Sequence, residues 1–177
     1  MIELILGGVK SGKSKLAEQH AIDSGLDVIY IATAMKEFDG IIDQSMIDRI
    51  RKHEDQRPNH WLVVEEPLKL TETLIKYASD DKFLLVDCLT LWLTNLLLND
   101  DKTLLKIETE ELIKTLPALN GKITFVSNET SMGIISESQL ARQFCDEAGV
   151  LHQQLATLSD RVILTVAGLP HVLKGSI

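Results

Sequence analysis

Short apolar segments alternate along the chain with longer segments in which apolar residues recur every three or four positions. The apolar runs are typical of strands, which we expect at Ile2–Leu6, Val28–Ala32, Trp61–Val64, Phe83–Val86, Ile123–Val126 and Val162–Val166. The periodic segments predict helices at Lys13–Ser24, Asp43–Arg57, Leu68–Tyr77, Leu104–Thr115 and Ser138–Leu158. Because several strands are apolar throughout, both faces of their sheet should be covered. The pattern therefore predicts an α/β fold with a mainly parallel central sheet flanked by helices.

The connections between these segments show no internal repeat and no low-complexity linker. We expect a loop at Lys36–Ile42, around Gly40, and a polar connection at Asn99–Thr103. The chain has 177 residues, against roughly 150 for a typical domain, so a single domain spanning residues 1–177 is predicted.

Composition and charge narrow the class of protein further. Apolar residues make up 45% of the chain and charged residues 25%, which is typical of globular proteins and excludes a mostly disordered chain or a fibre. The net charge of −8 disfavours a general affinity for nucleic-acid backbones or anionic membranes. We therefore expect no nucleic-acid partner, and any bound phosphate must be held by a local site.

Targeting and redox signals agree with a cytoplasmic protein. The run Met1–Gly8 carries an acidic residue and no basic segment, so no signal peptide is expected. The most apolar run, Phe83–Leu98, is interrupted by polar residues and is too short to span a bilayer, so we expect no membrane anchor. Cys88 and Cys145 lie far apart without zinc-type spacing, which favours two buried free thiols in a reducing compartment.

One segment carries a phosphate-binding motif. Gly7-Gly8-Val9-Lys10-Ser11-Gly12-Lys13-Ser14 fits the P-loop pattern and lies between an expected strand and an expected helix. The backbone N–H groups of such a loop wrap a phosphate chain, and the helix N-terminus adds its positive end. Lys13 would reach the β- and γ-phosphates, and Ser14 would ligate Mg²⁺. A glycine-rich turn without a ligand is the alternative interpretation.

A carboxylate at the end of a later strand supports this interpretation. Asp87 follows the apolar run Phe83–Val86, where a Walker-B acid would hold Mg²⁺ directly or through water. A carboxylate that merely caps the next segment is the alternative. Thr33, Asn128 and Gly168 also follow expected strands, and ligands of open parallel sheets bind beyond the carboxyl ends of strands.

The histidines are ambiguous on pattern alone. His53 shares one helix face with Met46, Ile50 and Arg57, and this spacing by itself favours a structural, partly buried histidine. The polar run around His53 also leaves a contact with a ligand open. The other histidines are expected to be structural or on the surface: His20, His60, His152 and His171.

Several segments together resemble one known family nearly end to end. They are Gly7–Ser14, Tyr30–Ala34, Arg49–Trp61 with Glu65 and Pro67, Asp87–Trp92 with Asn95–Leu97, Ser127–Glu129, Gly133-Ile134, Leu140–Phe144 and Ala167–Pro170. The chain resembles the bifunctional adenosylcobinamide kinase/adenosylcobinamide-phosphate guanylyltransferases of cobalamin biosynthesis. The P-loop is shared by many families, whereas the segment around His53, together with the segments around Asn128 and Gly168, is far more distinctive of this one.

The resemblance implies a RecA-like P-loop fold and two reactions. ATP or GTP would phosphorylate adenosylcobinamide with Mg²⁺, and GMP would then pass from GTP to adenosylcobinamide phosphate. His53 would carry GMP covalently, with Lys13 and Asp87 as the other catalytic residues and Ser14 and Asp87 as the Mg²⁺ ligands. The expected nucleotide contacts are Gly7, Gly8, Val9, Lys10, Ser11, Gly12, Lys13, Ser14, Thr33, Ala34, Met35, Glu54, Asp55, Gln56, Arg57, Glu65 and Asp87.

The resemblance also implies a homotrimer. Trp92, Leu93 and Leu96–Leu98 place more apolar side chains on one short stretch than a single core-facing stripe needs, which favours a homo-oligomer. Complete burial of this stretch within one chain is the alternative.

Two other functions are compatible with the motifs. A single-function small-molecule P-loop kinase would use Lys13 and Asp87 and give His53 no special role. A nucleotide-dependent switch or assembly module would bind nucleotide without catalysis.

The sequence also differs from the usual family residues at Ser45, Thr130-Ser131, Ser136 and His152, and Lys36–Ile42 is longer than usual.

Overall fold

The computed structural model describes residues 1–35, 37–38, 41–42, 44, 48 and 57–176. The strands are β1 (Ile2–Gly7), β2 (Asp27–Ala32), β3 (Glu37–Phe38), β4 (Ile41–Ile42), β5 (Leu62–Glu65), β6 (Lys82–Asp87), β7 (Lys122–Asn128), β8 (Arg161–Val166) and β9 (Leu169–Lys174). The helices are α1 (Lys13–Asp23), α3 (Leu70–Tyr77), α4 (Leu89–Leu98), α5 (Leu104–Thr115), the short 3₁₀ turn η1 (Leu116–Ala118) and α6 (Gln139–Leu158).

The main sheet places the ends of its central strands at one edge. Its strand order is β5-β2-β6-β7-β1-β8-β9, and all neighbours are parallel except β8 and β9. In the register of the sheet, Ala32 pairs with Asp87, and Gly7 pairs with both Asn128 and Thr165. The loops that follow β1, β2, β6, β7 and β8 therefore meet along the same carboxyl edge, as the sequence pattern predicts.

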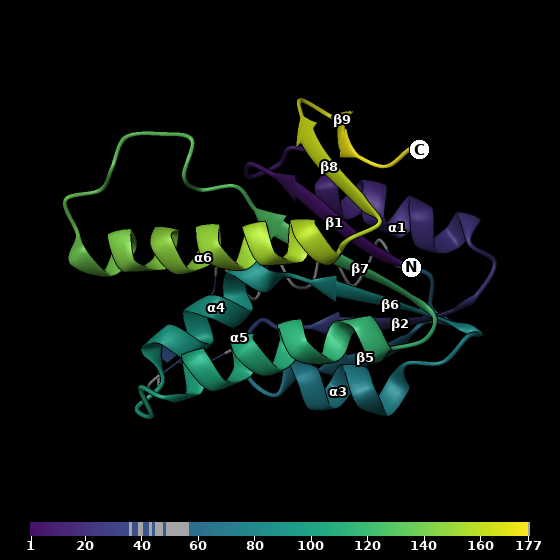
Figure 1. Ribbon diagram of the computed structural model, residues 1–177, viewed down its shortest axis with the longest axis horizontal. Helices are drawn as coiled ribbons and strands as arrows, with labels where there is room; N and C mark the ends of the chain where they lie inside the picture. The colour runs from purple at the N-terminus through teal and green to yellow at the C-terminus, as the bar shows by residue number, and fades with distance from the viewer. Residues whose placement is uncertain (36, 39–40, 43, 45–47, 49–56, 177) are drawn as a thin grey trace.

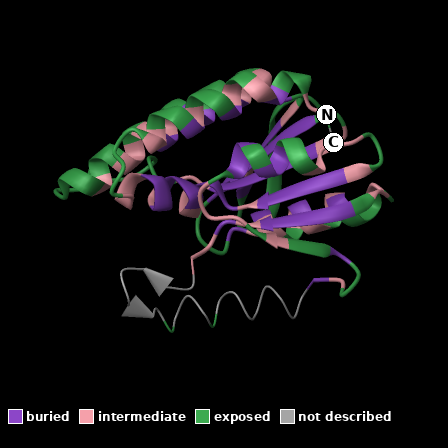
Figure 2. Ribbon diagram, turned by 90° about the horizontal axis from the view of Figure 1, so that it is seen from below, coloured by how far each residue is buried: buried purple, intermediate pink, exposed green. Residues whose placement is uncertain are grey.

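Helices cover both faces of the sheet (Figure 1). On one face, Ala17 and Ala21 of α1 pack against the apolar side chains of the central strands. On the other face, α3, α4, α5 and α6 enclose a larger core that contains Trp92 and Phe125. Figure 2 shows the buried strands between these layers and the exposed outer side of α6. The predicted α/β architecture with a mainly parallel sheet is confirmed.

The predicted elements agree with the structure except in four places. The segment Leu89–Leu98 is a helix that the pattern did not single out, because it is apolar on nearly every side and has no helical periodicity. The end of the chain adds β9, an edge strand whose residues are all exposed. The expected loop Lys36–Ile42 contains the antiparallel pair β3–β4. The expected strand Trp61–Val64 lies one residue later, and three of its four residues are exposed at this edge of the sheet. The expected helix Asp43–Arg57 falls almost entirely outside the described residues.

Burial within one chain accounts for most of the apolar stretch that suggested an oligomer. Trp92, Leu93 and Leu96 are at most 1% exposed, and Leu97 and Leu98 are half-buried. The Trp92 indole nitrogen donates to the Leu68 carbonyl at 2.8 Å. This stretch therefore forms intramolecular core and gives no support to an oligomer.

The structure tests the expected burial of the two cysteines and the expected lack of a membrane-spanning segment. Cys88 is buried, but Cys145 is only half-buried, so the expectation of two buried thiols is wrong for Cys145; both are free. Among the helices of the described segments, none is long and apolar enough to cross a membrane.

Candidate active site

The P-loop connects the end of β1 to the start of α1. Gly12 caps the helix with φ of 98°, a left-handed conformation that favours glycine, and Lys13 is the first helical residue. Gly8, Val9 and Lys10 are exposed and form the outer part of the loop. The sequence motif therefore folds as the strand–loop–helix unit that binds phosphates through backbone N–H groups and a helix N-terminus.

Lys13 folds back over the loop. Its ammonium donates to the Gly8 carbonyl at 3.0 Å, and the residue is 8% exposed. Burial lowers the pKa of Lys13 from its ordinary value, and the negative charge of Asp87 opposes part of that shift. The lysine and the Asp87 carboxylate thus interact at the same edge of the sheet, as the P-loop interpretation expects.

Residues from the ends of β7 and β8 brace the P-loop. The Glu129 N–H donates to the Gly7 carbonyl at 3.0 Å, and the Gly168 N–H donates to the Ser11 carbonyl at 2.9 Å. The Ser11 hydroxyl lies 2.8 Å from the Thr165 hydroxyl, which in turn donates to the Leu6 carbonyl. The predicted placement of Gly168 just past a strand end is confirmed, and its bond to the P-loop and the bracing role of Thr165 were not predicted.

Thr33 joins the ends of β2 and β6. Its buried hydroxyl donates to the Cys88 carbonyl at 2.7 Å and accepts from the Cys88 N–H at 2.9 Å. The peptide bond between Asp87 and Cys88 is cis. Asn95 on α4 donates to the Thr33 carbonyl at 2.8 Å. The structure therefore shows Thr33 as a buried clamp behind Asp87, and its expected nucleotide contact stays a prediction.

A tyrosine and an arginine lie against Asp87. The Tyr30 hydroxyl donates to Asp87 Oδ2 at 3.1 Å, and the Arg57 guanidinium lies 4.0 Å from the centre of the Tyr30 ring. Burial and the neighbouring Asp87 charge raise the pKa of Tyr30 well above its ordinary value, although the positive charge of Arg57 opposes this. The sequence pattern did not predict Tyr30 as part of the site. A hydroxyl-bearing side chain inside an otherwise apolar strand could have indicated a polar partner. Which residue that partner is depends on the register between strands, which the sequence does not give.

The other expected contacts fall into three groups. Ala34 and Met35 are half-buried beyond β2. Glu65 is exposed at the end of β5, where it pairs with Ala32 of β2. Val9 is 73% exposed on the outer side of the P-loop. The remaining expected residues lie outside the described part of the chain: His53, Glu54, Asp55 and Gln56.

The described histidines have the structural or surface positions that were expected. His152 is buried and lies 2.8 Å from the Ser127 hydroxyl, and burial lowers the pKa of this imidazole. His20 is bonded to Glu3, while His60 and His171 are exposed.

The donor atoms at the P-loop suit a magnesium ion. Ser14 lies half-buried on the first turn of α1, and Asp87 lies half-buried at the end of β6. A hydroxyl and a carboxylate are hard oxygen donors, and Mg²⁺ in nucleotide sites takes few protein ligands because phosphates and water complete its shell. These residues therefore fit the cation that the motif implies.

The parallel sheet, the braced P-loop and the carboxylate beside its lysine define a P-loop NTPase of the RecA-like class. Two solved structures share this fold. The flagellar accessory protein FlaH from Methanocaldococcus jannaschii matches with a TM-score of 0.55 and 15% identity over 99% of this chain and 78% of that chain. An ATPase from the type III secretion system of pathogenic bacteria matches with a TM-score of 0.54 and 13% identity over 97% of this chain and 56% of that chain.

The particular family is shown by the sequence comparisons. The model of the cobinamide kinase / cobinamide phosphate guanyltransferase family, CobU, matches residues 3–173, and the chain belongs to this family. It is 53% identical to the bifunctional adenosylcobalamin biosynthesis protein CobP of Pseudomonas aeruginosa over 99% of this chain and 98% of the relative. It is 37% identical to the bifunctional adenosylcobalamin biosynthesis protein CobU of Escherichia coli over 96% of this chain and 97% of the relative.

Proposed function

We propose that this protein is a bifunctional enzyme that phosphorylates adenosylcobinamide and then transfers GMP to the product. The family match over residues 3–173 supports the pair of activities. The observation that carries the proposal is the P-loop lysine, Lys13, held at the same sheet edge as the Asp87 carboxylate.

In the kinase reaction, the chain's residues would bind and orient a nucleoside triphosphate. The loop N–H groups and the helix N-terminus would hold the phosphate chain, and Lys13 would exchange its bond to Gly8 for the β- and γ-phosphates. Ser14 and Asp87 would hold Mg²⁺, which neutralises charge on the transferred phosphoryl group. The acceptor is the hydroxyl of adenosylcobinamide, and the donor is ATP or GTP.

In the transferase reaction, neutral His53 would attack the α-phosphorus of GTP and release pyrophosphate. The phosphate of adenosylcobinamide phosphate would then displace the histidine and give adenosylcobinamide-GDP. A covalent intermediate replaces one displacement between two bulky anions with two easier steps. Histidine suits this role because it is largely neutral at pH 7 and leaves readily once protonated. Arg57 would screen charge on the nucleotide.

Incubation with α-labelled GTP tests this proposal directly. We expect acid-labile covalent label on the wild-type protein and none on His53→Ala, which should still phosphorylate adenosylcobinamide. His53→Asn is the matched variant, because it keeps a polar side chain but cannot hold GMP. His152→Asn is the control histidine, and it should still label.

The outcomes separate the proposed function from its alternative. Label that persists on His53→Ala would move the nucleophile to another residue. Absence of label on the wild-type protein, together with kinase activity, would reduce the function to that of a single-function small-molecule kinase.

We further propose that the protein is a homotrimer. The described surface offers apolar side chains for such contacts: Met132, Ile134 and Ile135 are at least 76% exposed between β7 and α6, and Leu169 and Leu173 are at least 61% exposed on β9. Exposed apolar residues grouped in this way favour contacts between protein chains. A cytoplasmic location stays a prediction.

A further inference from the structure

We propose that Tyr30 is a positioning residue whose hydroxyl fixes the orientation in which Asp87 meets the cation at the P-loop. This inference rests on the proposed function, since it assigns Tyr30 a part in the magnesium-dependent steps. The observation behind it is the hydrogen bond from the Tyr30 hydroxyl to Asp87 Oδ2 at 3.1 Å.

The sheet register brings the two side chains together. Tyr30 pairs with Leu85 across β2 and β6, and Asp87 lies two residues further along β6. Residues two apart on a strand point to the same face, so Tyr30 and Asp87 share the face covered by α1. A long aromatic side chain spans this diagonal, whereas most other strand residues would not reach the carboxylate.

The surroundings hold the tyrosine ring in one place. Tyr30 is 4% exposed and packs within the core on the α1 side of the sheet. The Arg57 guanidinium covers the ring at 4.0 Å from its centre, a contact that is both electrostatic and steric. A ring held in this way presents its hydroxyl at a fixed position. The hydroxyl can therefore orient the half-buried Asp87 carboxylate.

The direction of the hydrogen bond determines its effect on the carboxylate. An ionised carboxylate only accepts, so the tyrosine hydroxyl is the donor and occupies one side of Oδ2. Rotation of the carboxylate would break this bond. Groups that bond to a metal ligand in this way commonly change metal affinity tenfold or more when they are removed.

Tyr30→Phe removes the hydroxyl and keeps the ring beneath Arg57. The chain offers a matched control in its other tyrosine, Tyr77 at the end of α3, which packs against the core on the other face of the sheet and loses the same group in Tyr77→Phe. Asp87→Asn serves as the variant that removes the ligand charge itself. Thermal unfolding of each variant verifies that its fold is retained.

The measurement is the affinity for Mn²⁺ of the complex with a non-hydrolysable GTP analogue, followed by electron paramagnetic resonance. We expect the Kd for Mn²⁺ to rise about tenfold in Tyr30→Phe and to stay at the wild-type value in Tyr77→Phe. In kinase assays, Tyr30→Phe should need more Mg²⁺ for half-maximal rate, with the KM for nucleotide little changed and the rate recovering at high Mg²⁺.

Two outcomes would overturn the inference. The first is an unchanged Mn²⁺ affinity in Tyr30→Phe. The second is an equal loss of Mn²⁺ affinity in Tyr30→Phe and Tyr77→Phe, because such a loss would indicate a general effect on stability. Failure of the proposed function is distinguishable. Loss of the transferase role alone would abolish covalent labelling by α-labelled GTP and leave Mn²⁺ binding in place, whereas failure of the P-loop site would leave even the wild-type protein unable to bind Mn²⁺ with the nucleotide analogue.

Discussion

Lys13 has two partners that define its role at the residue scale. Its ammonium is bonded to the Gly8 carbonyl, and it lies within the electrostatic reach of Asp87. An incoming anion stabilises the charged form of a buried cation whose pKa is lowered, because the phosphate oxygens replace both water and the loop carbonyl as its partners. The local structure therefore favours the proposed contact of Lys13 with a triphosphate.

Replacement of Lys13 should remove this function. We expect Lys13→Ala to lower kcat/KM for adenosylcobinamide phosphorylation by about 10²–10³-fold, since a preorganised charge on the transferred group is lost. Steady-state assays with ATP and with GTP measure the effect. Lys15→Ala, which removes an exposed lysine from the same helix, is the control and should keep the wild-type rate. A wild-type rate in a folded Lys13→Ala variant would exclude the P-loop role.

At the scale of elements, the P-loop depends on close approach between β1 and β8. A Cβ atom at Gly7 would overlap the Thr165 hydroxyl and carbonyl and the Ser11 hydroxyl, whereas a Cβ atom at Gly8 would meet nothing within 4 Å. The first glycine of the motif is therefore required by packing between strands, and the second faces open space where a ligand can approach.

This difference predicts unequal effects of the same substitution. Gly7→Ala should destabilise the fold by about 1–3 kcal/mol through overpacking, and Gly8→Ala should change stability by much less. Urea unfolding without nucleotide measures both variants. Equal stabilities of the two variants would show that the strand ends can separate without cost.

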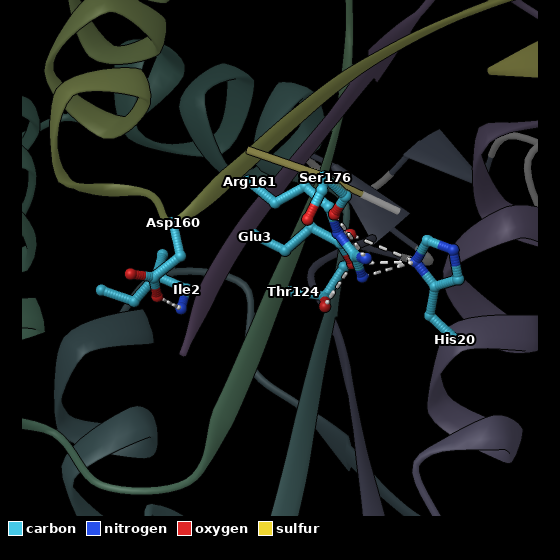
Figure 3. Close-up of polar contacts among 7 residues, drawn as sticks. All are labelled: Ile2, Glu3, His20, Thr124, Asp160, Arg161 and Ser176. Atoms are coloured by element: carbon cyan, nitrogen blue, oxygen red, sulfur yellow. Dashed lines mark hydrogen bonds and ion pairs between the residues drawn. The ribbon is translucent and has the colours of Figure 1, made fainter. Parts of the chain in front are cut away.

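A buried charge cluster stabilises the opposite, amino edge of the sheet (Figure 3). The Glu3 carboxylate accepts from the Arg161 guanidinium and from the Thr124 hydroxyl, and His20 Nδ1 lies 3.1 Å from both of its oxygens. Burial raises the pKa of Glu3, but the bonds and charges of His20 and Arg161 outweigh burial, so the net pKa lies below the ordinary value of 4.5. The cluster links β1, β7, β8 and α1, and Arg161 also donates to the carbonyl of Ser176 near the end of the chain.

The lowered pKa predicts how stability depends on pH. A carboxylate whose pKa is lower in the folded state stabilises fully above its unfolded pKa and loses this contribution as the pH falls through the folded value. We expect Glu3→Gln to lower the free energy of unfolding by about 3 kcal/mol at pH 7, and the difference from wild type to shrink below pH 4.5.

Urea unfolding between about pH 3 and about pH 7, a range that includes the ordinary glutamate pKa of about 4.3, measures this dependence. Glu110→Gln is the control, because Glu110 is exposed and lies 3.8 Å from Lys106 in a weak surface pair. A constant difference between Glu3→Gln and wild type across this range would contradict the assignment.

At the scale of the whole molecule, the assembly is the property to measure. Because α4 is buried within one chain, the contacts of the proposed trimer should use the exposed segment at Met132–Ile135 or the exposed strand β9. We expect light scattering at micromolar concentration to give about three times the 19.7 kDa mass of one chain. Ile134→Asp and Leu173→Asp should shift this mass if their segment forms the contact, and a 19.7 kDa particle in the wild type would exclude the trimer.

The sequence by itself determined the α/β class, the P-loop, Asp87 at a strand end and the family. These features depend on periodicity and residue spacing within short segments, so they can be read without knowing how distant segments pack. The tertiary structure decided which residues meet from distant segments. The bond from Tyr30 to Asp87 depends on strand register, and the bracing of Ser11 by Thr165 depends on the position of β8 beside β1. The burial of α4 also depends on packing, because an all-round apolar segment fits a core and an interface equally well until its neighbours are placed.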